Sequence, residues 1–185
     1  MATTFAVSSQ ALQDTLGILD TEEYSRALGA LCAARRILFC GFGESSPVAS
    51  LAAARFARLG VDSRAPADLS AQIAAAALLG PGDVLFALCR TGRSSTVVKA
   101  AKLACARGAT VVVVTNYPFS ALAKQAGVLL RTADFAEHSP DQPLCGVLSQ
   151  YCLLESLYAN LVKARGEDII PALRSADNAA AEYEL

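Results

Sequence analysis

Short apolar runs alternate with apolar helical stripes along the middle of the chain, from about residue 36 to residue 132. Runs rich in branched side chains are typical of strands buried on both faces of a parallel sheet. Five segments have this character: ILFC at 37–40, VDSRA at 61–65, VLFAL at 84–88, TVVVVT at 110–115 and VLLRT at 128–132. The second of these is the most polar, so we expect it nearer an edge. Helical stripes fill the intervals, which predicts alternating strands and helices.

Helical patterns also precede this region. Residues 5–34 predict two helices, the first with an apolar stripe that includes Leu16 and Leu19. Asp20 stands three residues before Glu23 at the start of the second helix, as in a capping box. Two helices ahead of the first strand predict a hairpin that packs on the domain or on a partner subunit.

The C-terminal part is predicted to be helical as well. Residues 133–143 (ADFAEHSPDQP) are polar and contain proline, which favours a loop. Apolar positions at helical spacing then predict a long helix at about 146–164 that ends at Gly166. A last amphipathic helix is expected through 167–182.

Several helices inside the alternating region begin with capping signals. Pro47 suits the first position of a helix capped by Ser46. Asp68 or Ser70 begins an alanine-rich helix, and Ser120 is placed to cap a short one.

Five strands separated by helices of about 10–15 residues imply right-handed βαβ units and a parallel sheet covered on both faces. We therefore predict a three-layer α/β/α sandwich with a five-stranded parallel sheet of flavodoxin-like type and an N-terminal helical extension. The 185 residues suit a single domain. Its parts are N-terminal helices at 1–35, an α/β core at 36–132 and C-terminal helices at 146–185.

Composition and charge exclude several classes of protein. Apolar residues make up 54% of the chain and charged residues 18%, which argues against intrinsic disorder. The formal net charge of −1 offers no basic face, so we expect no direct nucleic-acid binding by this chain. No uncharged run reaches the roughly 18 residues that a membrane-spanning helix needs. The six cysteines form no CxxC pair and no signal-like N-terminus is present, so we expect reduced thiols in a cytoplasmic protein.

Two strands end in loops of unusual chemistry. GFGESS at 41–46 follows the first strand, and CRTGRSST at 89–96 connects the third strand to a helix at 95–107. A strand, a hydroxyl-rich glycine turn and a helix together bring backbone N–H groups and a helix N-terminus to an anion, and phosphate is the obvious candidate. Ligands of open α/β sheets bind beyond the carboxyl ends of the strands. The expected ligand-binding residues are Gly41, Gly43, Glu44, Ser45, Ser46, Cys89, Thr91, Gly92, Arg93 and Ser94.

The same loops do not fit the common nucleotide motifs. GxGxxG would require glycine at the position of Ser46, and no acidic residue ends the second strand to hold a ribose. The GxxxxGK[ST] motif is absent. We expect neither a nucleotide cofactor nor a metal.

Three segments, in order, resemble those of sugar isomerase (SIS) domains. GFGESSPVA at 41–49 is similar to the family's GxGxSxxxA segment, and LCRTGRSSTVVKAAKLA at 88–104 is similar to its S-x-S-G-x-T segment with the following helix. GATVVVVTNYPFSALAKQA at 108–126 resembles a third block, so the likeness covers about residues 35–130. The N-terminal helices and residues 149–168 resemble the effector-binding half of RpiR-type transcription regulators, which carry a helix-turn-helix domain upstream.

The resemblance implies roles for individual loop residues. Ser45 matches the serine of the first segment and is expected to contact phosphate or sugar. Thr91 stands at the second serine of S-x-S-G-x-T, Gly92 at its glycine and Ser94 at its threonine. Cys89 replaces the first serine, and a thiol is a weaker hydrogen-bond donor than a hydroxyl. The implied ligand is a phosphorylated sugar or amino sugar, and the implied assembly is a homodimer or homotetramer.

An isomerase and a sensor remain as alternatives. Moving a proton between neighbouring sugar carbons requires a positioned base, usually Glu or His. The candidates are Glu137 and His138 in the polar loop and Glu155 on the long helix, where burial can raise the pKa of a carboxyl. For Glu155 we favour the alternatives of a solvent-facing residue or an ion-pair partner across a dimer. At the position where related isomerases carry a glutamate early in the penultimate helix, this chain has Ser149. We therefore favour a non-catalytic phosphosugar sensor, with no catalytic residues, over a sugar-phosphate isomerase.

Overall fold

The computed structural model describes residues 2–133 and 145–181, and its five strands form one parallel sheet. The strands are β1 (Arg36–Gly41), β2 (Asp62–Arg64), β3 (Asp83–Leu88), β4 (Thr110–Thr115) and β5 (Val128–Arg131). Their order across the sheet is β2-β1-β3-β4-β5, and every neighbouring pair is parallel. This is the order of flavodoxin-like folds, so the predicted fold class is confirmed.

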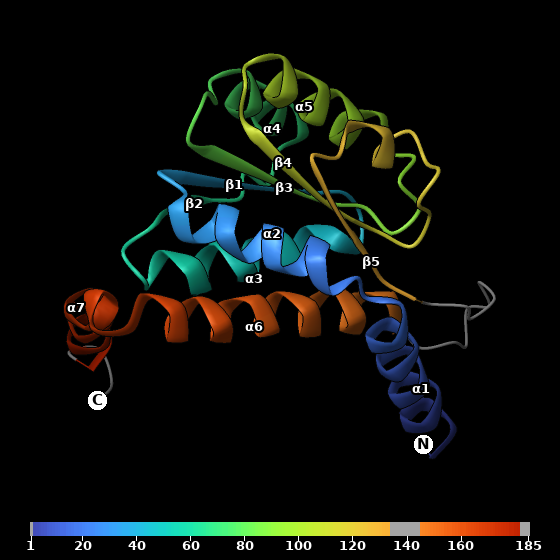
Figure 1. Ribbon diagram of the computed structural model, residues 1–185, viewed down its shortest axis with the longest axis horizontal. Helices are drawn as coiled ribbons and strands as arrows, with labels where there is room; N and C mark the ends of the chain where they lie inside the picture. Colours follow the sequence, from blue (N-terminus) through green and yellow to red (C-terminus); the bar gives the residue numbers. More distant parts are fainter. Residues whose placement is uncertain (1, 134–144, 182–185) are drawn as a thin grey trace.

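Helices cover both faces of the sheet, as Figure 1 shows. One face is covered by α2 (Thr21–Ala33), α3 (Ser45–Ala57) and α6 (Cys145–Arg165), and the other by α4 (Leu69–Ala77) and α5 (Ser95–Ala106). Outside the three layers lie α1 (Ala2–Ile18) and α7 (Ile170–Ala181). Two 3-10 turns complete the described elements: η1 (Ala123–Gln125), which packs against α5 and β4, and η2 (Gly166–Ile169), which joins α6 to α7. No helix within the described ranges has the length and apolar character needed to cross a membrane.

The core divides into two clusters because successive residues of a strand face opposite sides of a sheet. Phe39 of β1 packs against Phe56 of α3 and Phe86 of β3, with ring centroids 5.4 Å apart in each pair. Its neighbour Cys40 faces α4 and α5 instead and is fully buried. Burial raises the pKa of the Cys40 thiol to about 12, so it remains protonated and acts as an apolar side chain.

Aspartates cap two of the helices. Asp20 accepts hydrogen bonds from the backbone N–H groups of Glu22 and Glu23, 2.8 and 3.0 Å away, as predicted. The prediction that Glu23 completes a capping box with Asp20 is wrong, because the Glu23 carboxylate accepts instead from the N–H of Leu129 on the edge strand β5. Asp68 caps α4 by accepting from the N–H of Ala71, so Asp68 rather than Ser70 begins that helix.

Two other predicted helix starts are corrected. The helix α3 begins at Ser45 after Glu44, so Ser46 and Pro47 lie inside its first turn rather than at the cap and the first position. Ser120 does accept a hydrogen bond from the N–H of Ala123, but only the single 3-10 turn η1 follows. Gly166 ends α6 as predicted.

Asp83 ties together the amino ends of β1 and β3. Its fully buried carboxylate accepts hydrogen bonds from both Arg35 and Arg36 and from the N–H of Gly80. The hydrogen bond from the Arg36 guanidinium lowers the pKa of Asp83 most. Desolvation of the buried carboxylate raises this pKa and Arg35 lowers it further, so that the pKa lies well below its ordinary value. The carboxylate is therefore charged at neutral pH and joins the two central strands.

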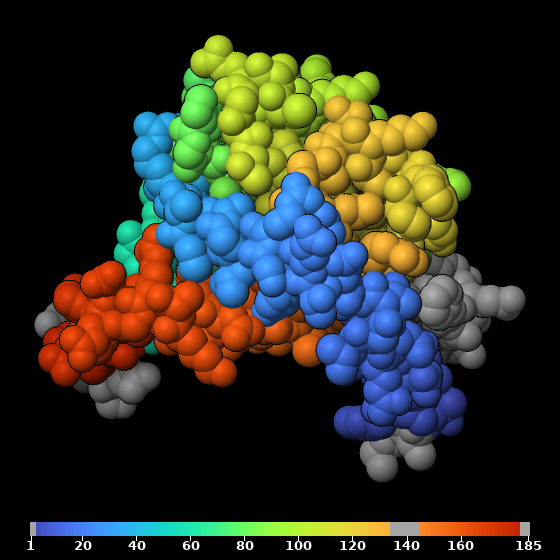
Figure 2. All heavy atoms as spheres, in the orientation of Figure 1, coloured from blue at the N-terminus to red at the C-terminus, as the bar shows by residue number. Residues whose placement is uncertain are grey.

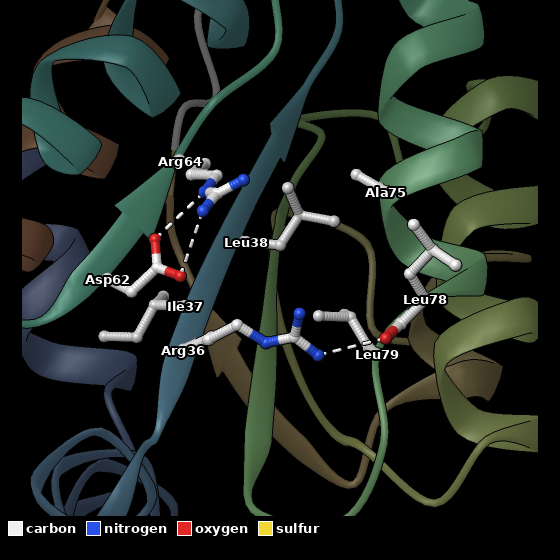
Figure 3. Close-up of a pocket in the computed structure, with 8 residues that line it drawn as sticks. All are labelled: Arg36, Ile37, Leu38, Asp62, Arg64, Ala75, Leu78 and Leu79. Atoms are coloured by element: carbon white, nitrogen blue, oxygen red, sulfur yellow. Dashed lines mark hydrogen bonds and ion pairs between the residues drawn. The ribbon is translucent and has the colours of Figure 1, made fainter.

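A hollow of about 80 Å³ lies beside this amino end, between the edge of the sheet and α4 (Figure 3). The charged side chains that line it already have partners there: Arg64 pairs with Asp62, and Arg36 donates to the carbonyl of Leu78 at 3.0 Å. The hollow lies at the opposite end of the sheet from the two hydroxyl-rich loops, so it is no part of the site predicted from the sequence.

Candidate ligand-binding site

The two hydroxyl-rich loops lie next to each other at the carboxyl edge of the sheet. Strands β1 and β3 are hydrogen-bonded neighbours in register, with Gly41 opposite Leu88 at their carboxyl ends. The chain leaves β1 toward α3 on one face and leaves β3 toward α5 on the other. This is the switch point of the sheet, where open α/β folds bind their ligands. Strand order, which the sequence left open, therefore brings the predicted loop residues together.

The first loop turns sharply into α3. A Cβ atom on Gly41 would lie 2.5 Å from the carbonyl oxygen of Ser45, so this glycine allows the helix to begin directly against the strand. Gly43 has a φ of +58°, the left-handed conformation that glycine adopts most readily, with open space around it. Ser45 is 3% exposed, whereas Glu44 beside it is exposed.

The side chain of Gln72 supports this loop from α4. Its amide nitrogen donates to the carbonyl oxygens of Gly41 and Pro66, each 3.0 Å away, and the side chain is 1% exposed. Sequence reasoning missed Gln72, because a single glutamine in an alanine-rich helix resembles an ordinary polar face.

The second loop is closed by a tight turn. The N–H of Gly92 donates to the carbonyl of Cys89 at 3.0 Å, and the N–H of Arg93 donates to the Thr91 hydroxyl at 3.4 Å. Cys89 is 5% exposed, with its sulfur 3.8 Å from the Thr91 hydroxyl oxygen. Thr91 and Ser94 are half-buried and Arg93 is exposed. Cys89 thus lies at the base of the turn, and the hydroxyls and the arginine lie nearer its surface.

The loop after β4 holds the second loop in place. The carbonyl of Arg90 accepts from the Thr115 hydroxyl and from the N–H of Asn116, both at 3.0 Å. The carbonyl of Gly92 accepts from the N–H of Leu122. A Cβ atom on Gly92, whose φ is +63°, would lie 2.0 Å from the Ser120 hydroxyl oxygen. The missing side chains of Gly41 and Gly92 therefore leave room for neighbouring protein atoms, and the contact of these two residues with a ligand stays a prediction.

The two helices that begin at the switch point have no side-chain cap. Neither Glu44 before α3 nor Ser94 before α5 makes a capping hydrogen bond, in contrast to Asp20 and Asp68 at the starts of α2 and α4. The first N–H groups of a helix have no partner within the helix. Those of α5 are therefore available to an acceptor from outside, and the helix dipole favours a negatively charged one.

A buried glutamine that the sequence did not single out lies at the same end of the sheet. Gln150 is 1% exposed, and neither its amide nitrogen nor its oxygen has a hydrogen-bond partner among the described residues. Its neighbour Ser149 donates to the carbonyl of Ala133, just beyond the carboxyl end of β5. An unpaired buried polar group costs about 1–3 kcal/mol.

Among the alternative catalytic residues, Glu155 lies within the described ranges, and it is engaged on a neighbouring helix rather than at the two loops. Glu155 lies in the third turn of α6, where both of its oxygens accept from the guanidinium of Arg55 on α3, at 3.1 and 2.8 Å. The same guanidinium lies 4.1 Å from the centroid of the Tyr158 ring. Glu155 therefore joins two helices as one partner of an ion pair. Glu137 and His138 lie outside the described residues.

Comparisons with known proteins agree with this geometry. A family model described as the SIS domain matches residues 30–161. The NanR protein of Vibrio vulnificus, solved in complex with ManNAc-6P, superposes with a TM-score of 0.91 at 23% identity, covering 100% of this chain and 70% of that one. This likeness shows a shared fold.

Two relatives in sequence are longer proteins. An uncharacterized HTH-type transcriptional regulator of Thermotoga maritima is 31% identical over 180 residues, which cover 97% of this chain and 64% of that protein. A bifunctional protein glk of Paraburkholderia xenovorans is 42% identical over 116 residues, or 62% of this chain and 18% of that protein. The chain thus spans less than two thirds of each.

Proposed function

Because this chain belongs to the SIS domain family, we propose that it binds a phosphorylated sugar or amino sugar between the loops after β1 and β3 and leaves it unchanged. One observation carries the proposal: the two helices that begin at the switch point, α3 and α5, lack the side-chain caps that α2 and α4 possess. A phosphate group at this point would accept hydrogen bonds from the N–H groups in the first turn of α5.

Each loop has a part in this proposal. The Ser45, Thr91 and Ser94 hydroxyls donate to the phosphate oxygens, and the exposed Arg93 supplies positive charge. Gly41, Gly43 and Gly92 set the path of the backbone, with Glu44 and Ser46 completing the first loop. Cys89 lies below the turn and donates weakly, so the adjacent hydroxyls carry most of the binding.

The sensing role is supported by the state of Glu155, one of the three candidate bases, and by the relatives. Isomerisation requires a base near the substrate, and Glu155 is engaged by Arg55. The chain resembles the effector-binding domains of regulators, among them a NanR protein solved with ManNAc-6P. We propose that it is the phosphosugar-sensing part of a transcription regulator. With a net charge of −1, it leaves DNA contact to other parts of such a protein.

The test is thermal unfolding in the presence of hexose and N-acetylhexosamine phosphates, with the free sugars and inorganic phosphate as comparisons. A ligand at a hundredfold excess over its Kd stabilises by about 2.7 kcal/mol, which raises the Tm of a domain of this size by about 5–10 °C. We expect this shift with at least one sugar phosphate and recovery of the ligand unchanged. Failure of every sugar phosphate to shift the Tm would contradict the binding proposal, and conversion of the ligand would contradict the sensor.

A serine pair on α3 locates the site. Ser45→Ala removes a hydroxyl at the switch point and is expected to weaken ligand binding about tenfold or more, the equivalent of one hydrogen bond to a charged group. Ser50→Ala removes an exposed hydroxyl further along the same helix and is expected to change nothing. Equal affinity of the two variants would place the ligand elsewhere.

We also propose that the chain forms a homodimer or a homotetramer.

A further inference from the structure

The carboxamide of Gln150 is buried without a hydrogen bond. Its side chain is 1% exposed, and both the oxygen and the nitrogen lack a partner among the described residues. Ser149 beside it is buried too, but its hydroxyl donates to the carbonyl oxygens of Ala11 and Ala133. Almost all buried polar groups in folded proteins are hydrogen-bonded, so an exception of this kind calls for a partner that the folded chain does not itself supply.

The helices α3 and α6 run side by side in the same direction (Figure 1). Arg55 and Glu155, which form an ion pair between them, each lie ten residues after the first residue of their helix. Beyond the other ends of the two helices, a Cβ atom on Gly60 would lie 3.1 Å from the Cβ atom of Ala172. The first turn of α6 is therefore level with the first turn of α3, which begins at Ser45 in the candidate site.

Gln150 faces the sheet from this first part of α6. It lies one turn before Leu154 on the buried side of the helix. Leu154 belongs to the core cluster that contains Val114 of β4 and Leu130 of β5, both near the carboxyl ends of their strands. Because helical side chains point back toward the N-terminus of their helix, the carboxamide is directed from this cluster toward the carboxyl edge of the sheet.

The same side chain is shielded from solvent. In Figure 2 the first turns of α6 lie behind α1 and the start of α2, whereas its later turns reach the surface. A carboxamide in such a place exchanges no hydrogen bond with bulk water. A hydrogen bond that a bound molecule offers there is therefore stronger than one at an exposed position.

We propose that Gln150 binds the sugar part of the ligand and that its carboxamide holds two neighbouring sugar hydroxyls. The amide oxygen accepts from one hydroxyl, and the amide nitrogen donates to the oxygen of the next. A carboxamide presents an acceptor and a donor side by side, and adjacent ring hydroxyls present the matching pair. An ionised phosphate offers only acceptors, so it leaves the amide oxygen unsatisfied.

This inference rests on the proposed function, in which the loops after β1 and β3 hold the phosphate. It adds the residue by which the protein distinguishes a sugar phosphate from free phosphate.

The first test compares two buried glutamines without any ligand. Gln150→Met keeps the length and flexibility of the side chain and removes both polar atoms, so its Tm is expected to rise by about 2–4 °C. Gln72→Met is the matched control, because Gln72 is equally buried but donates to the carbonyls of Gly41 and Pro66. Its Tm is expected to fall by a similar amount or more, since two carbonyl groups lose their donor.

The second test is calorimetric titration of the unmodified protein and Gln150→Met. The probes are the 6-phosphates of glucose, mannose, fructose, N-acetylglucosamine and N-acetylmannosamine, together with inorganic phosphate. For the sugar phosphate that binds the unmodified protein most tightly, Gln150→Met is expected to weaken binding at least about tenfold. The affinity for inorganic phosphate is expected to stay the same.

Single-deoxy analogues of that sugar phosphate locate the contact. Removal of either of two adjacent hydroxyls is expected to weaken binding to the unmodified protein and to have little further effect in Gln150→Met, because each contact is lost only once.

A lower Tm for Gln150→Met would mean that the carboxamide has a partner within the protein, and this result would overturn the inference. Unchanged affinity of the variant for the sugar phosphate, or an equal loss for inorganic phosphate, would overturn it as well and leave the proposed function standing. If no sugar phosphate binds the unmodified protein, the proposed function fails and this inference fails with it.

Discussion

A single contact, between Gly92 and Ser120, fixes the shape of the second loop. Gly92 has a φ of +63°, and its missing side chain leaves room for the Ser120 hydroxyl. That hydroxyl accepts from the N–H of Ala123 in the next loop. The conformation of the turn that presents Thr91 and Ser94 therefore depends on a residue beyond the following strand.

Gly92→Ala is expected to destabilise the protein by about 3 kcal/mol, from the unfavourable positive φ and from a Cβ atom forced against Ser120. Chemical denaturation measures this change. Gly43→Ala is the control, because Gly43 has a similar φ of +58° but open space around it, so only the backbone cost of about 1–2 kcal/mol remains. Replacing Ser120 by glycine in the Gly92→Ala background is expected to recover part of the loss, and no recovery would contradict the steric explanation.

Charge pairing joins elements at the amino end of the sheet. Asp83 begins β3 and is paired with Arg35 and Arg36, which lead into and begin β1. The pKa of Asp83 is lower in the folded protein than the value of about 3.9 for an unfolded chain. Its contribution to stability is therefore complete above about pH 4 and is lost as the pH falls toward the folded pKa.

Asp83→Asn is expected to lower the free energy of unfolding by about 3 kcal/mol at pH 7, because it weakens several charge-assisted hydrogen bonds at once. The difference from the unmodified protein should shrink as the pH falls below about 4, where the native carboxylate begins to lose its advantage. Denaturation across this pH range measures it. Asp177→Asn is the control, because Asp177 also forms an ion pair but its side chain is 59% exposed, so its loss should lower the free energy of unfolding by about 1 kcal/mol or less at any pH. A destabilisation by Asp83→Asn that stays constant with pH would contradict the role given to the Asp83 charge.

The whole molecule is a three-layer body to which α1 is attached through few polar contacts. The Thr15 hydroxyl accepts from the N–H of Ala133 at 2.9 Å, and both Thr15 and Ser149 contact the carbonyl of that residue. Ala133 follows β5 at the end of the sheet where the candidate site lies. One threonine thus connects the projecting helix to the sheet.

Thr15→Val keeps the shape of the side chain but leaves the buried N–H of Ala133 without its partner, at an expected cost of about 1–3 kcal/mol. Thr4→Val, at an exposed position on the same helix, should be neutral. Hydrogen exchange distinguishes the two, because the amides of α1 should exchange faster in Thr15→Val while those of β3 and β4 stay protected. Uniform loss of protection would mean that α1 is integral to the body.

The local sequence pattern was enough to predict the kind and the approximate bounds of the main elements, including all five strands and the aspartate cap of α2, and it narrowed the start of α4 to Asp68 or Ser70. These depend on near neighbours: a branched apolar run, a helical stripe, an aspartate two or three residues before the N–H groups that it accepts from. The pattern of the two hydroxyl-rich loops was equally local, so the candidate site residues could be named from it.

The contacts of those residues, in contrast, depend on how the chain packs in three dimensions. Strand order placed the loops side by side, and Gly92 met Ser120, Glu155 met Arg55 and Gln72 met Gly41, partners far apart along the chain. It also left Leu16 in solvent, although its position in an apolar stripe predicted contact. The physical reason is that packing and pairing depend on the distance between residues in space, which a local pattern of side chains does not specify.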